Sequence, residues 1–101
     1  NTREISIEYI QKLVCDYFSI PVDQVKSKTR KREIVQARQI SMFYAKDLTK
    51  SSLKTIGMHF GGRDHSTVIH ACQTVNDLME TDKKFKADID EIGKRIKMNL
   101  V

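Results

Sequence analysis

The stretch Gly61–Ala71 reads GGRDHSTVIHA, and it separates two helical patterns of different character. The double glycine interrupts the first pattern, because glycine destabilises a helix interior and readily adopts turn conformations. The polar residues that follow open a second helix, which becomes apolar from Val68 onward. This helix therefore has a buried stem and a polar N-terminal tip, as do helices that read DNA bases.

The residues on either side of this stretch complete a helix-turn-helix pattern. Upstream, Ser52 can cap a short helix that carries Leu53 and Ile56 and runs to Phe60. Downstream, Asp64 can cap a helix whose apolar stripe consists of Val68, Ala71, Cys72, Val75, Leu78 and Met79. The second helix of such a pair enters the major groove of DNA. Many helical proteins contain a similar glycine turn, so the pattern by itself does not assign a function.

Apolar residues at helical spacing predict helices in the rest of the chain. A helix capped by Ser6 carries Ile7, Ile10, Leu13, Val14, Tyr17 and Phe18 on one face, and Ile20-Pro21 ends it. Residues 22–25 suit one short helical turn, and a long helix runs from about Glu33 to Leu48. The stripe of a last helix, after Thr81-Asp82, is Phe85, Ile89, Ile92 and Ile96.

We therefore expect an all-α fold, a compact bundle of about six helices containing a helix-turn-helix preceded by a basic loop. A chain of 101 residues is one domain at most, so residues 1–101 form a single DNA-binding domain in this interpretation. The chain begins with Asn1 rather than methionine, which indicates a fragment of a longer protein.

The positive charge of the chain is concentrated in its middle third. The net charge is +5 and the isoelectric point about 9.3. The segment from Lys26 to Arg63 contains ten basic and two acidic residues, a net charge of +8, whereas the rest of the chain has a net charge of −3. Residues 26–32, KSKTRKR, contain five basic residues and read as an exposed loop. A basic segment beside a helix-turn-helix favours a polyanionic partner, although charge runs are often only solvated surface.

Several other classes of function lack a sequence signature. No apolar run approaches the length of a membrane span, and the N-terminus has no signal-peptide core. Cys15 and Cys72 fall on apolar stripes, which favours a reducing cytoplasm over a disulfide. The three histidines show no metal-ligand spacing with a cysteine, and the chain has neither a P-loop nor a nucleophile with a nearby base. We expect no metal, no cofactor and no catalysis in this domain.

The residues of the helix-turn-helix are more specific than its pattern. Ile56-Gly57 and Phe60–Ala71 closely resemble the signature of the C-terminal DNA-binding domain of the DnaA family, the bacterial chromosomal replication initiators. Lys28–Arg32 resembles the basic loop of that family, and residues 37–42 and 45–49 resemble its long helix after the loop. The resemblance runs in order along nearly the whole chain.

The resemblance implies sequence-specific binding to double-stranded DNA at the DnaA boxes of an origin, with the recognition helix in the major groove and an arginine of the loop in the minor groove. The positions that it implies for base reading are Arg30, Leu53, Asp64, His65 and Ser66. Those that it implies for contact with the DNA backbone or support of the site are Lys28, Arg38, Gln39, Lys46, Lys54, Arg63, Thr67 and His70. Lys54 replaces a frequent proline of the family, which puts the second apolar contact with thymine in doubt. Ser66 replaces a frequent threonine; it keeps the hydroxyl but lacks the methyl group that could touch a thymine methyl.

The resemblance also implies partners and a location. The domain would bind DNA as a monomer in the bacterial cytoplasm, associated with the nucleoid, and position the remaining domains of the same initiator for origin opening. Two alternatives stay open at this point. The stripe from Phe85 to Ile96 could dock a protein partner instead of completing the core, and ordinary helix-turn-helix regulators bind palindromes as dimers.

Overall fold

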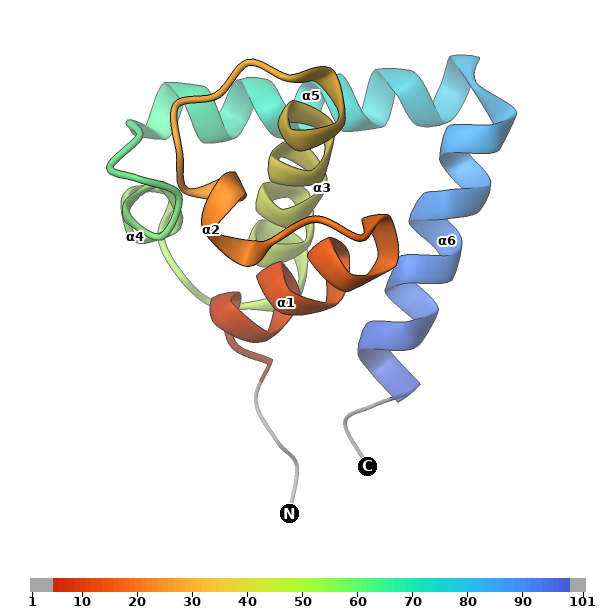
Figure 1. The fold of residues 1–101 in the computed structure, drawn as a ribbon, viewed down its shortest axis with the longest axis horizontal. Helices are drawn as coiled ribbons and strands as arrows, with labels where there is room; N and C mark the ends of the chain where they lie inside the picture. The colour runs from red at the N-terminus through yellow and green to blue at the C-terminus, as the bar shows by residue number, and fades with distance from the viewer. Residues whose placement is uncertain (1–4, 99–101) are drawn as a thin grey trace.

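The computed structural model describes residues 5–98, which form six α-helices joined by turns and loops, with no strand (Figure 1). The helices are α1 (Ile7–Phe18), α2 (Val22–Val25), α3 (Arg32–Leu48), α4 (Leu53–Met58), α5 (His65–Thr81) and α6 (Lys83–Met98). The prediction of an all-α bundle of about six helices is confirmed. The chain folds with a radius of gyration of 12.6 Å, the size expected of a single domain of about 100 residues.

The helices begin where short polar side chains can cap them. The Ser6 side chain accepts a hydrogen bond from the Tyr9 amide at 3.1 Å, and Ser52 does the same for Thr55 at 3.1 Å. The carboxylate of Asp64 caps α5. These bonds satisfy backbone amides that have no partner within the first turn of a helix, so the three predicted N-caps are confirmed.

Two helix boundaries differ from the sequence-based expectation. Helix α3 begins at Arg32, one residue earlier than expected. Helix α4 ends at Met58 rather than at Phe60. The chain tightens there, because the Phe60 amide donates to the Gly57 carbonyl only three residues back, at 3.1 Å. Phe60 nevertheless remains fully buried.

The core lies around α3, which packs against α1, α2, α4 and α5. Its largest fully buried side chains include Ile10, Ile40, Met42, Ile56, Phe60, Ile92 and Ile96. Leu78 and Met79, at the end of the predicted α5 stripe, are only half-buried. Helix α6 packs on α5 and α1.

The stripe of α6 belongs to this core. Phe85, Ile89, Ile92 and Ile96 are at most 7% exposed. The apolar face that could have docked a protein partner is therefore covered by the domain itself.

Candidate nucleic-acid interface

Close backbone contacts fix the turn between α4 and α5. Gly61 and Gly62 adopt φ angles of 88° and 77°, which are unfavourable for residues with a side chain. The Arg63 amide donates to the Gly57 carbonyl at 3.0 Å. A Cβ atom at Gly57 would lie 2.0 Å from the Arg63 carbonyl oxygen, and one at Gly61 would lie 2.4 Å from the Lys26 carbonyl oxygen. Glycine at these two positions lets the turn approach both α4 and the loop before α3.

The tip of α5 presents polar side chains held by the helix cap. Asp64 Oδ1 accepts hydrogen bonds from the Thr67 amide at 2.9 Å and from the Thr67 hydroxyl at 3.0 Å. These bonds lower the pKa of the Asp64 carboxyl below its ordinary value. Asp64, His65 and Ser66 are all exposed. Because both bonds from Thr67 fall on the same oxygen, capping leaves the carboxylate able to accept a further donor from outside.

The basic loop is defined here as residues 26–31, between α2 and α3. The guanidinium of Arg38 donates to three backbone carbonyls in or next to this loop: Val25 at 3.1 Å, Ser27 at 2.9 Å and Thr29 at 3.1 Å. Arg38 is only 7% exposed. Burial, and secondarily the charge of Arg63, lower its pKa from the usual arginine value.

Of the two roles expected for Arg38, contact with the DNA backbone or support of the site, these bonds fit the supporting one. Its guanidinium is directed into the protein and holds the basic loop in place. An arginine can hold three backbone carbonyls at once, because its guanidinium supplies several donors in a fixed geometry. We therefore assign Arg38 to positioning the loop.

A second arginine joins the basic loop to the helix-turn-helix. Arg63 Nη2 donates to the Ser27 carbonyl at 3.1 Å, and its Nε donates to the Phe60 carbonyl at 3.1 Å. Ser27 thereby accepts from both Arg38 and Arg63. Sequence reasoning missed this shared carbonyl, because a backbone acceptor leaves no residue signature.

Two hollows lie side by side on this face, and Arg38 and Arg63 line both. The first, of about 540 Å³, runs between the basic loop and the glycine turn, with Lys28 and Arg30 on its rim. The second, of about 360 Å³, separates α3 from the first turns of α5 and is lined by Gln39, Ser66, Thr67 and His70, among others. The structure therefore brings the loop and the tip of α5 to one continuous face.

The exposure of the remaining predicted site residues varies. Lys28, Arg30, Lys46, Lys54 and His70 are exposed, whereas Gln39, Leu53, Arg63 and Thr67 are half-buried. Lys46, Leu53 and Lys54 line neither hollow. They lie on the last turn of α3 and the first turn of α4.

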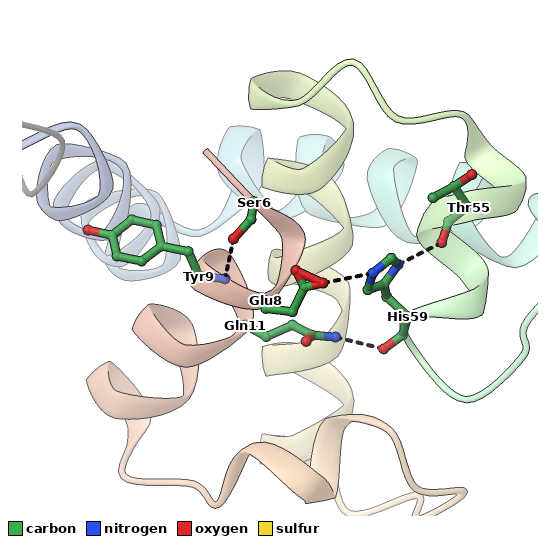
Figure 2. A network of polar contacts seen from close by, with 6 residues as sticks. All are labelled: Ser6, Glu8, Tyr9, Gln11, Thr55 and His59. Atoms are coloured by element: carbon green, nitrogen blue, oxygen red, sulfur yellow. Dashed lines mark hydrogen bonds and ion pairs between the residues drawn. The ribbon is translucent and has the colours of Figure 1, made fainter. Parts of the chain in front are cut away.

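A network of hydrogen bonds connects α1 to the end of α4 (Figure 2). Gln11 is 1% exposed, and its Nε2 donates to the His59 carbonyl at 2.7 Å. The His59 ring bridges two helices, with Nε2 2.9 Å from Glu8 Oε1 and Nδ1 3.0 Å from the Thr55 carbonyl. Sequence reasoning considered His59 only as a metal ligand and did not single out Gln11 at all.

Other site types find no support in residues 5–98. Among these residues, no group of three or more potential ligands could hold a metal ion. No helix in the same range has the length and apolar character needed to cross a membrane.

Comparison with known proteins gives consistent matches. A family profile described as "Bacterial dnaA protein helix-turn-helix" matches residues 7–75. The chain is 55% identical to the chromosomal replication initiator protein DnaA of Flavobacterium psychrophilum over 96 residues, which cover 95% of this chain and 20% of that protein. It is 50% identical to DnaA of Chlorobaculum tepidum, over 97% of this chain and 20% of the relative. The chain thus spans about a fifth of the length of these relatives.

Proposed function

Because this chain belongs to the family of bacterial DnaA helix-turn-helix domains, we propose that it binds double-stranded DNA sequence-specifically at the DnaA boxes of a replication origin. The observation that carries the proposal is the attachment of the basic loop to the helix-turn-helix through Arg63 and the Ser27 carbonyl. Two elements that suit the two grooves of DNA are thereby held on one face. The domain binds and performs no chemistry.

In the major groove, the tip of α5 reads base edges. The exposed carboxylate of Asp64 can accept from the amino group of a cytosine, and His65 can donate to a purine acceptor. The hydroxyl of Ser66 serves as donor or acceptor, and Leu53 makes apolar contact with a thymine methyl. Thr67 and His70, beside this tip, contact phosphates, and so do Gln39, Lys46 and Lys54 from α3 and α4.

In the minor groove, the basic loop inserts Arg30. A narrow A·T-rich minor groove has an enhanced negative potential that attracts arginine. Arg30 is exposed on the rim of the hollow between loop and turn. Lys28 contacts the neighbouring phosphates, while Arg38 and Arg63 keep the loop in register with α5.

The remaining domains of the initiator are placed away from the DNA in this proposal. In Figure 1, the start of α1 and the end of α6 lie at the bottom of the molecule, and the basic loop lies at the top. A monomer can therefore carry the rest of the protein on one side and hold the origin on the other.

The proposal is tested by measuring affinity for a DnaA-box duplex and for a scrambled duplex of equal length at increasing salt. The box should be preferred at every salt concentration. For both duplexes the logarithm of affinity should fall linearly with the logarithm of salt, by roughly 0.9 per phosphate contact, because bound counterions are released. Equal affinity for the two duplexes, or a flat response to salt, would refute the proposal.

A further inference from the structure

The outward face of α5 extends beyond its tip. Ser66, Ile69, His70 and Gln73 follow one another at the spacing i, i+3, i+4 and i+7, and all four are exposed. This spacing gathers side chains on one side of a helix. Helices that lie along the major groove, such as that of homeodomains, use the same spacing for base contacts. The face available to DNA is therefore two turns long.

Ile69 is the unusual member of this face. It is 39% exposed, and the only other large apolar side chains exposed in residues 5–98 are Met58 and Met98, near the ends of α4 and α6. Its neighbours along the helix face are polar, and Ser66 and His70 line the adjoining hollow. An apolar side chain in this position adds little to the domain's own core.

The rotation of α5 keeps Ile69 directed outward. Val68, Ala71 and Cys72 are at most 9% exposed and anchor the adjoining face of the helix in the core. Ile69 is β-branched, so its side chain has few rotamers in a helix and loses little freedom on forming a contact.

We propose that Ile69 is a specificity-determining residue that contacts the 5-methyl group of a thymine, one step beyond the bases read at the tip. This inference rests on the proposed function. The thymine methyl is the apolar group that base edges present in the major groove. Ile69 lies three residues beyond Ser66, which is about 4.5 Å along the helix axis and comparable to the roughly 3.4 Å between successive bases.

The test compares thymine with deoxyuridine, which lacks only that methyl group. Each thymine of a DnaA-box duplex is replaced in turn, and the affinity of the wild-type chain and of Ile69→Ala is measured at one salt concentration. Besides the thymine that Leu53 contacts, one further position should cost the wild type roughly fourfold in affinity, as for one buried methyl group. On the unmodified box, Ile69→Ala should bind more weakly than the wild type by a similar factor. Replacing the thymine at that further position with deoxyuridine should not weaken the binding of Ile69→Ala any more.

Met98→Ala, which removes an equally large exposed side chain on α6, is the matched control and should behave as wild type on every duplex. Thermal melting of Ile69→Ala should match that of the wild type, since the side chain is exposed. The inference would be overturned if the losses from Ile69→Ala and from thymine replacement were additive at every position. It would also be overturned if Ile69→Ala bound the box as tightly as the wild type. A wild-type chain that does not distinguish the box from a scrambled duplex would instead refute the proposed function.

Discussion

At the scale of single residues, the interface depends on positions where a side chain cannot fit. Gly57 lies inside α4, where alanine is ordinarily the better helix former. Its place is fixed by the Arg63 carbonyl, 2.0 Å from where a Cβ atom would lie. Gly62 differs, because a Cβ atom there meets nothing within 4 Å, and its φ of 77° alone opposes substitution.

These two glycines give a matched pair of variants. Gly57→Ala should lower the free energy of unfolding by about 3 kcal/mol, because the backbone of α4 and the turn must move apart. Gly62→Ala should cost about 1 kcal/mol, the strain of a left-handed conformation. Urea denaturation of both variants measures the difference. A Gly57→Ala variant that is as stable as Gly62→Ala would show that the close approach is not a constraint.

Asp64 caps a helix and still presents an exposed carboxylate. Its Oδ1 caps α5 through Thr67, and the carboxylate stays exposed at the tip of the recognition helix. The capping role follows from local sequence, since an N-cap bonds an amide three residues on. The exposure of the carboxylate follows from the turn, which directs the start of α5 outward.

At the scale of elements, the basic loop and the helix-turn-helix act as one unit. Arg38 and Arg63 come from α3 and from the turn, and both donate to the Ser27 carbonyl. The loop carries the exposed Lys28 and Arg30 on a backbone that is held from beneath. The geometry of the loop, and not only its charge, should therefore decide how Arg30 meets the minor groove.

Arg38→Lys tests this point, because it keeps the charge but removes the planar array of donors. We expect weaker binding to the DnaA box and a reduced preference for its A·T-rich end, since the loop no longer holds Arg30 in register. The scrambled duplex should lose little affinity. Lys86→Arg, which also conserves charge at an exposed position of α6 away from both hollows, is the control. If Arg38→Lys retains the wild-type preference, Arg38 does not position the loop.

At the scale of the whole molecule, stability and binding occupy different regions. The buried face of α6 packs on α1 and α5, and no residue of α6 lines either hollow of the interface. The positive charge of the chain gathers between Lys26 and Arg63, whereas the segments outside this range have a net negative charge. Helix α6 thus supports the fold, whereas the residues of the candidate interface come from other elements.

Ile92→Ala should separate these two properties. Ile92 is 1% exposed, and its truncation should lower the free energy of unfolding by about 2–5 kcal/mol through lost packing and a residual cavity. Well below the melting midpoint, affinity for the DnaA box should stay within about twofold of the wild type, because the interface is untouched. Lys94→Ala, exposed on the same helix, should change neither quantity. A large loss of affinity in folded Ile92→Ala would show that α6 is coupled to the interface.

The sequence by itself determined the features that depend on neighbours along the chain. The caps at Ser6, Ser52 and Asp64, the apolar stripes and the glycine turn all act over one or two helical turns, so their residue patterns predict them. The motif around Gly61–Ala71 likewise indicated the family before any coordinates were considered. The roles of individual site residues remain predictions.

Only the tertiary structure decided which distant groups meet. Gly61 approaches the Lys26 carbonyl, Arg38 turns inward to the basic loop, and His59 reaches Glu8 across 51 residues of sequence. Such contacts depend on how helices pack around α3, and their acceptors are often backbone carbonyls that every residue possesses. A sequence can therefore name the residues of a basic loop and a recognition helix, but packing determines that they form one surface.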